Sequence, residues 1–217
     1  MILTLVRHGQ SEGNARRVIR GWGGGPLTPL GRNEAVLTAH RLATWGPFDA
    51  LYSSPLVRAH ETATIIGNRL GLRPLLHDDL RELNVGQLNG LGREQAEATF
   101  PGLIEQWRRD DPTLVMPHGE VIADFHRRAL DAFRRVCAPH PRGHIMVVSH
   151  VCLISAYLTQ LFEDRPSIRM AWEMWNCSIT RLEFVNGEIR LHCFNRHAHL
   201  DHLFPDMANT GFNRRDR

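Results

Sequence analysis

The stretch I-L-T-L-V-R-H-G-Q, residues 2–10, places an arginine and a histidine directly after an apolar run. Residues 2–6 have the length and composition of a buried β-strand, so the Arg7-His8 pair is expected where that strand ends. A second apolar run, H-I-M-V-V-S at residues 144–149, also reads as a buried strand and is also followed at once by a histidine. The two runs predict strands that present polar side chains at their carboxyl ends.

Strand and helix signals alternate along the rest of the chain. Thr28-Pro29 predicts the N-cap and first turn of a helix that runs to about Trp45. Ser54-Pro55 is expected to cap the next helix, which Gly71 ends. Asn186-Gly187 is typical of a two-residue hairpin turn. The other expected elements are a strand at 49–52, a helix-rich section at about 93–136, a helix from about 151, and hairpin strands at 178–185 and 188–194.

This alternation predicts an α/β fold: a three-layer, doubly wound, mainly parallel sheet with helices on both faces and an antiparallel element near the end. The chain shows no internal repeat or linker, so we expect a single domain over residues 1–217. Within it we expect a small helical cap insertion at about 83–138 and a disordered tail from about residue 208.

Composition excludes several classes of protein. All 26 basic residues are arginines, so neither a Walker A loop at Gly23–Gly25 nor a lysine Schiff base can be formed. The arginines suit an anionic substrate, although a coding bias would give the same count. No segment resembles a signal peptide or a membrane span, so we expect a cytoplasmic protein without a membrane partner. The basic cluster at 214–217 is best interpreted as a solvated tail, and no nucleic-acid partner is expected.

Three segments are expected to meet at one edge of the sheet. Open α/β sheets place their sites beyond the carboxyl ends of the strands, at a topological switch point. His8 follows the first strand, His150 follows the strand at 144–149, and Arg58 lies in the first turn of the helix after the second strand. An arginine near a helix N-terminus is unfavourable, because its charge repels the positive end of the helix dipole. A bound anion at that position would make the arrangement favourable. Alternatively, Arg58 extends to solvent and the histidines are structural.

Several blocks of the sequence resemble a known protein family. Five blocks occur in order, and together they are similar to the histidine phosphatase superfamily, the phosphoglycerate mutase-like proteins. The ending C-F-N-R-H-A-H-L resembles that family's final strand, so the resemblance covers nearly the whole chain. The five blocks are L-V-R-H-G-Q-S-E-G-N, P-L-T-P-L-G-R, L-Y-S-S-P-L-V-R-A-H-E-T-A, L-R-E-L-N-V-G-Q-L-N-G and V-V-S-H.

The resemblance implies a reaction and a set of roles. His8 would be the nucleophile that forms a phosphohistidine, and Glu82 the general acid and then the base. The positions that would contact the phosphoryl oxygens are Arg7, Asn14, Arg58 and His150. Two arginines and an imidazole can stabilise a phosphoryl group, so we expect no metal and no cofactor. Gly9 would let the backbone approach the phosphate. Glu120 and Asp201 are other carboxylates, but only Glu82 falls in a matching block.

The same intermediate serves a phosphatase or a mutase. Arg93 and the Trp107-Arg108-Arg109 segment resemble positions with which mutases hold a second anionic group. Val85 stands where mutases carry a tyrosine, and Val151 replaces a small residue. The P-H-G-E segment ending at Glu120 resembles the phosphatase branch. We therefore favour a phosphomonoester hydrolase acting on a small phosphorylated metabolite, with a phosphoglycerate mutase as the alternative.

One rival comes from a different class of enzyme. The stretch His197-Ala198-His199-Leu200-Asp201-His202 matches the H-x-H-x-D-H signature of zinc-dependent hydrolases, which would use metal-activated water. No histidine or cysteine follows it to complete a binuclear site. The oligomeric state stays open, with a homodimer as one alternative, as does the role of Trp172 and Trp175. The arginines expected on the solvated side of the helix-rich section are Arg127, Arg128, Arg134 and Arg135.

Overall fold

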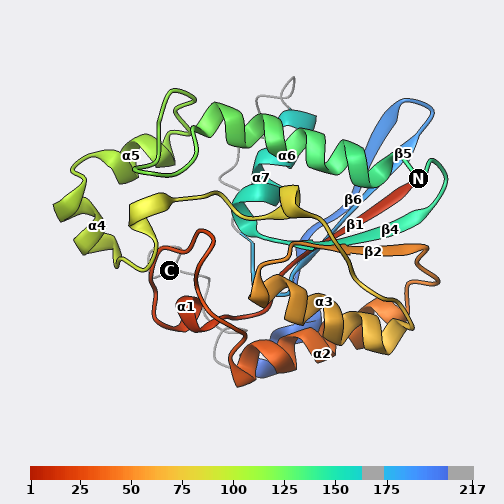
Figure 1. The fold of residues 1–217 in the computed structure, drawn as a ribbon. Helices are drawn as coiled ribbons and strands as arrows, with labels where there is room; N and C mark the ends of the chain where they lie inside the picture. The colour runs from red at the N-terminus through yellow and green to blue at the C-terminus, as the bar shows by residue number, and fades with distance from the viewer. Residues whose placement is uncertain (163–173, 205–217) are drawn as a thin grey trace.

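A computed structural model describes residues 1–162 and 174–204 of the chain (Figure 1). The described strands form one mixed sheet in the order β3-β2-β4-β1-β5-β6, in which β3, β2, β4 and β1 are parallel and β5 pairs antiparallel with both β1 and β6. This confirms the predicted fold class. The strands are β1 (Ile2–Arg7), β2 (Ala50–Ser53), β3 (Leu75–Leu76), β4 (His144–Ser149), β5 (Ile179–Val185) and β6 (Glu188–Arg196).

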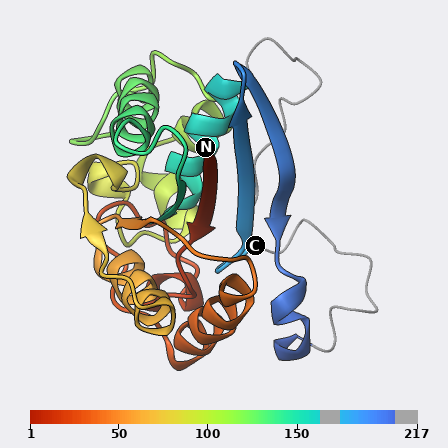
Figure 2. The ribbon, with the colours of Figure 1, turned by 90° about the vertical axis from the view of Figure 1, so that its right-hand side faces the viewer.

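Helices cover both faces of the sheet, α2 and α3 on one and α6 and α7 on the other (Figures 1 and 2). The alternation of side chains along a strand supplies both cores: Leu3 and Leu5 pack with α6 and α7, whereas Val6 packs with α2 and α3. The α-helices among the described residues are α1 (Glu12–Ala15), α2 (Pro29–Ala43), α3 (Val57–Leu70), α4 (Arg93–Thr99), α5 (Leu103–Arg108), α6 (Ile122–Cys137) and α7 (Val151–Leu161), and the short 3-10 helices there are η1 (Asp78–Leu80), η2 (Gly86–Leu88) and η4 (Ala198–Leu203).

Local signals predicted most helix boundaries correctly. Thr28 caps α2, because its hydroxyl accepts a hydrogen bond from the Gly31 N–H at 3.0 Å. Gly71 ends α3 in the left-handed conformation, with φ of 70°. The Ser54-Pro55 prediction was wrong: α3 begins at Val57 without a side-chain cap.

The hydroxyl of Ser54 has other partners. Its Oγ lies 2.8 Å from Nε2 of His150 and accepts from the Leu56 N–H at 3.3 Å. The predicted hairpin is confirmed, since Asn186 and Gly187 both have positive φ, 50° and 80°, between β5 and β6.

The connections of the sheet place the expected crevice at the carboxyl ends of β1 and β4. β1 and β4 are neighbours and parallel, yet the chain passes from β1 to α2 on one face and from β4 directly into α7 on the other. Their carboxyl ends therefore flank a topological switch point. Figure 1 shows α4 and α5 at the same end of the molecule.

Other predictions concern the extent of the domain and its surroundings. The single domain with a cap at about 83–138 stays a prediction. The tail from about 208 and Trp172 lie outside the described residues. No helix in residues 1–162 and 174–204 combines the length and apolar character needed to cross a bilayer.

Candidate active site

Three strand ends bring His8, His150 and Arg58 together. The backbone N–H of His8 donates to the Ser149 carbonyl at 2.9 Å, which extends the β1–β4 pairing to the crevice. The His8 and His150 rings have centroids 5.2 Å apart. Arg58, at the second position of α3, donates from Nε to Nε2 of His8 at 3.1 Å. The convergence expected at the rim of the sheet is present in the structure.

Hydrogen bonds determine which nitrogen of His8 carries the proton. Nδ1 lies 2.7 Å from the Gly9 carbonyl oxygen. Because a carbonyl only accepts, Nδ1 bears the hydrogen, and Nε2 keeps a lone pair directed at the Arg58 guanidinium. Burial lowers the pKa of His8 well below 6.5, and the charges of Arg58 and Arg7 and the neighbouring His150 lower it further. His8 is therefore a neutral imidazole whose Nε2 carries a lone pair and no hydrogen.

His150 is a second neutral imidazole beside it. Burial, followed by the charges of Arg58 and Arg7, lowers the pKa of His150 well below 6.5. Its Nδ1 is a buried atom without a hydrogen-bond partner among the described residues. A buried polar atom of this kind is costly unless a ligand reaches it.

Two predicted arginines lie in the crevice and carry positive charge at neutral pH. Burial lowers the pKa of Arg58 to about 10, and burial followed by the nearby Arg20 lowers the pKa of Arg7 to about 10. Arg58 donates from Nη2 to the Gly21 carbonyl at 2.8 Å and from Nη1 to the Gly23 carbonyl. Arg7 donates from Nη1 to a backbone carbonyl, while its Nε is buried without a partner among the described residues.

Arg20 brings a third guanidinium group to this site, and no pattern in the sequence had predicted this position. Its Nη1 donates to the Gly13 carbonyl at 3.2 Å and to the Val18 carbonyl at 2.9 Å. Burial lowers the pKa of Arg20, and the Glu82 carboxylate opposes that shift. The sequence offered one signal: Arg20 stands just before Gly21 and Trp22, which lead into the glycine run.

Glu82 reaches the crevice from the loop after η1. Only 4% of the residue is exposed. Its Oε1 accepts from the Leu83 N–H at 3.0 Å and the Leu153 N–H at 3.2 Å, and its Oε2 accepts from the Cys152 N–H at 3.2 Å. Two of these donors are free N–H groups in the first turn of α7, where the helix dipole favours a negative charge. The carboxylate thus lies beside the turn that carries His150.

Asn14 and Gly9 have structural functions that the sequence did not indicate. Oδ1 of Asn14 accepts from both N and Oγ of Ser11, at 3.0 and 2.8 Å, in the capping box of α1. This leaves the Asn14 amide NH₂ as the group that could reach a phosphoryl oxygen. At Gly9, a Cβ would stand 2.5 Å from the Gly31 carbonyl oxygen, so the close approach there is to the start of α2.

The side chains of the H-x-H-x-D-H segment have other partners. His199 Nε2 lies 2.9 Å from Thr38 Oγ1, and His197 Nδ1 lies 2.9 Å from the Asn195 carbonyl oxygen. The His197 ring also stacks on Trp175 at 4.7 Å between centroids. Across residues 1–162 and 174–204, no group of three or more His, Cys, Asp or Glu side chains is placed to hold a metal ion. The described geometry gives the zinc alternative no support.

The residues at the mutase-like positions have different surroundings. Arg108 and Arg109 both bind Glu105, at 2.8 and 3.0 Å. Arg93 and Arg108 also line a hollow of about 300 Å³, whose other lining residues are Ile19, Ile104 and Trp107. Val85 is buried, and a Cβ on Gly21 would meet its Cγ2 at 2.8 Å, so the Val85 side chain packs against the Gly21 backbone.

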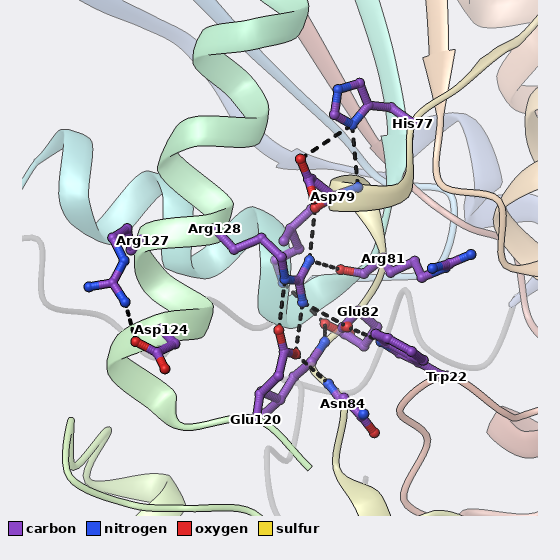
Figure 3. A network of polar contacts seen from close by, with 12 residues as sticks. Trp22, His77, Asp79, Arg81, Glu82, Asn84, Glu120, Asp124, Arg127 and Arg128 are labelled. Atoms are coloured by element: carbon purple, nitrogen blue, oxygen red, sulfur yellow. Dashed lines mark hydrogen bonds and ion pairs between the residues drawn. The ribbon is translucent and has the colours of Figure 1, made fainter.

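The prediction for Arg128 was wrong. Arg128 is not on the solvated side of α6: it forms an ion pair with Glu120, with Nε and Oε1 2.8 Å apart, and donates to backbone carbonyls near Glu82 (Figure 3). Arg127, Arg134 and Arg135 are exposed, as expected. Glu120, considered above as another acid, is engaged in this ion pair.

Known proteins are similar to this chain in sequence and in fold. The family model described as histidine phosphatase superfamily (branch 1) matches residues 3–197. A probable phosphoglycerate mutase from Yersinia enterocolitica is 34% identical over 188 residues, covering 83% of each chain. A solved mycobacterial glucosyl-3-phosphoglycerate phosphatase aligns with a TM-score of 0.78 at 31% identity, over 89% of this chain and 98% of that chain. A phosphoserine phosphatase from Entamoeba histolytica, in complex with 3-phosphoglyceric acid, aligns with a TM-score of 0.78 at 28% identity, over 92% and 98%.

Proposed function

Because the chain belongs to the histidine phosphatase superfamily, we propose that it hydrolyses phosphomonoesters through a phosphohistidine formed on His8. The observation that carries this proposal is the neutral His8 imidazole, whose Nε2 lone pair faces a buried guanidinium. Phosphoryl transfer depends mainly on positioning and on stabilising charge on the equatorial oxygens. The crevice offers both, with three guanidinium groups and a second imidazole around the nucleophile.

In the first step, Nε2 of His8 attacks phosphorus and the bond from phosphorus to the ester oxygen breaks. Glu82 gives a proton to the departing oxygen. The Arg58 guanidinium transfers its hydrogen bond from Nε2 to a phosphoryl oxygen, which frees the lone pair. Positive charge develops on the ring at Nδ1–H, where the Gly9 carbonyl accepts the hydrogen bond and stabilises it.

In the second step, water attacks the phosphoryl group of the phosphohistidine. The Glu82 carboxylate takes a proton from the water, and the bond between phosphorus and Nε2 breaks, returning its electron pair to the imidazole. Inorganic phosphate then leaves and Glu82 is again protonated. One residue thus serves as acid and then as base, with each role contributing about 10²- to 10⁴-fold.

The chemistry of the crevice supports an anionic, phosphorylated small molecule as substrate. Arg7, Arg58, His150 and the amide NH₂ of Asn14 would contact the phosphoryl oxygens. The relatives support the same class: one is named a glucosyl-3-phosphoglycerate phosphatase, and another was solved with 3-phosphoglyceric acid. The proposed reaction needs no metal ion and no cofactor.

A phosphoglycerate mutase is the second candidate. The observation that favours it is the pair of arginines, Arg93 and Arg108, that line one hollow and could hold a second anionic group. A mutase would pass the phosphoryl group from His8 to another hydroxyl of the substrate instead of to water. Val85 weighs against this alternative, because a buried valine stands where mutases carry a tyrosine, so no hydroxyl is present at this position.

³¹P NMR distinguishes the two candidates directly. The purified protein is incubated with 3-phosphoglycerate, a trace of 2,3-bisphosphoglycerate and EDTA, beside the His8→Ala variant. We expect inorganic phosphate to accumulate with the wild-type protein and none to form with the variant. Formation of 2-phosphoglycerate without phosphate would establish the mutase. Activity that appears only in a parallel incubation without EDTA would contradict metal independence and revive the zinc alternative.

A further inference from the structure

The Arg128 guanidinium, on α6, uses all of its hydrogen-bond donors (Figure 3). Nε and Nη2 donate to the two carboxylate oxygens of Glu120, each at 2.8 Å. Nη1 donates to the carbonyls of Asp79 and Arg81, at 2.8 and 2.9 Å, and Nη2 also donates to the Glu82 carbonyl at 3.1 Å. These five bonds match the five N–H groups of a guanidinium.

The acceptors belong to the short segment that carries Glu82. Arg128 binds three backbone carbonyls before and at Glu82, those of Asp79, Arg81 and Glu82. The segment after it is bound by Glu120, whose Oε2 accepts from the Asn84 N–H at 2.7 Å and whose own N–H donates to the Asn84 carbonyl at 2.9 Å. One ion pair therefore holds the backbone on both sides of Glu82.

The P-H-G-E segment packs tightly enough to make this possible. A Cβ on Gly119 would stand 2.2 Å from the Asn84 carbonyl oxygen. At Gly86, where φ is 53°, a Cβ would stand 1.9 Å from the Pro117 carbonyl oxygen. Glycine is required at both positions, because the two backbones are in direct contact.

The ion pair is largely shielded from solvent. The side chains of Arg128 and Glu120 are 17% and 22% exposed. By contrast, the neighbouring Arg127 is 69% exposed and binds Asp124 one turn earlier in the same helix. Arg127 is therefore a matched control of the same residue type in the same helix, and Figure 3 shows its guanidinium paired with Asp124, on the side of α6 away from the Glu82 segment.

We propose that the Arg128–Glu120 ion pair positions Glu82 for proton transfer to the leaving group, an inference that rests on the proposed function. The ion pair fixes the backbone of Glu82, while α7 fixes its carboxylate through the N–H groups of Cys152 and Leu153. Arg128 touches no reacting atom and is a positioning residue. A displacement of about 1 Å at a reacting group costs about 100-fold in rate, so the orientation of this loop matters for proton transfer.

Arg128→Lys tests this proposal, since lysine keeps the charge but has no planar fork and only three donors. Glu120→Gln is the second variant, and Arg127→Lys is the control. We would measure kcat/KM for phenyl phosphate and for 2,4-dinitrophenyl phosphate. The two substrates are similar in shape, but only the phenolate leaving group needs a proton. kcat/KM reports the steps up to release of the leaving group, so the second step does not interfere.

We expect R128K and E120Q to lower kcat/KM for phenyl phosphate by about 10- to 100-fold, and that for 2,4-dinitrophenyl phosphate by less than about threefold. R127K should match the wild-type protein on both substrates. An equal loss on both substrates in R128K and E120Q would mean that the ion pair only maintains the fold, and would overturn the proposal. So would an unchanged rate in both variants.

Glu82→Gln separates this proposal from the proposed function. E82Q should show the same dependence on leaving group as R128K, with a larger loss on phenyl phosphate. If E82Q shows the dependence and the two ion-pair variants do not, only the positioning role is wrong. If E82Q itself loses equally on both substrates, Glu82 is not the acid and the proposed mechanism fails with it.

Discussion

The reactivity proposed for His8 rests on one hydrogen bond and on the surroundings of the ring. The bond of 2.7 Å to the Gly9 carbonyl oxygen places the proton on Nδ1, and burial among cations keeps the ring neutral. The sequence predicted the place of His8, because a charged pair at the end of an apolar run marks the end of a buried strand. It could not predict the tautomer, which depends on where the ring lies relative to a single carbonyl.

The first prediction concerns the protonation of His8. Because burial and the nearby Arg58 lower its pKa well below 6.5, His8 should stay neutral as the pH is lowered through 6.5. ¹⁵N NMR of histidine-labelled protein should show His8 as the Nδ1–H tautomer above and below that pH. The unfolded protein in urea provides the reference, in which histidines titrate at their ordinary pKa. A His8 midpoint near 6.5 in the folded protein would contradict the assignment of a neutral nucleophile.

Arg20 shows why part of the site escaped the sequence. Its side chain lies between the backbones of Gly13 and Gly24, one before and one after it in the chain. A Cβ on Gly13 would stand 2.6 Å from its Cδ, and one on Gly24 would stand 3.2 Å from its Cγ. The Arg20 side chain becomes buried only when the chain folds so that these two glycines pack against it. Arg128 was misplaced for a related reason, since helical periodicity assigned it to the solvated side of α6 and could not indicate the segment packed there.

The helices could be predicted where the signal is local. Thr28 and Pro29 cap α2 with groups that are adjacent in the chain. Ser54 failed as a cap of α3, because its hydroxyl lies against His150, 96 residues away. Glu82 shows the converse case: a residue outside α7 binds the free N–H groups in its first turn. Such contacts between distant segments follow from the topology of the sheet and not from any local pattern.

The second prediction concerns the contact between α2 and the loop after β1. A Cβ on Gly31 would stand 2.0 Å from the Gln10 carbonyl oxygen, so Gly31→Ala should push that loop away from the helix. We expect a loss of about 1 to 3 kcal/mol in the free energy of unfolding, measured by urea denaturation. kcat/KM should also fall, by about tenfold or more, because the loop begins two residues after the nucleophile.

Gly92→Ala is the matched control for that change. Gly92 precedes α4 with ordinary negative φ, and an added Cβ would meet only the Gln95 side chain at 3.5 Å. Gly92 is the N-cap of α4, where alanine is less favourable than glycine, so this variant should lose about 0.5 kcal/mol. If G31A were as stable and as active as G92A, the close contact between α2 and the His8 loop would have no energetic weight.

The molecule as a whole places its chemistry where two chain connections diverge. The parallel neighbours β1 and β4 lead to helices on opposite faces, and their ends carry His8 and His150. The alternation of strands and helices predicted this layered fold and its antiparallel end. Short-range patterns did not specify the order of the strands, nor the contact of the P-H-G-E segment with the Glu82 loop. Both depend on how segments distant in the chain pack together.

The central claim is that the phosphoryl group is transferred to His8. The most direct test mixes E82Q with 2,4-dinitrophenyl phosphate in the presence of EDTA, then identifies the modified peptide by mass spectrometry under alkaline conditions. The dinitrophenolate leaves without a proton, while the missing base slows hydrolysis, so the phosphoenzyme should accumulate. We predict one acid-labile phosphoryl group on His8, and none in the double variant that also carries His8→Ala. Dinitrophenolate release without modification of His8, or a phosphoryl group on another residue, would contradict the account.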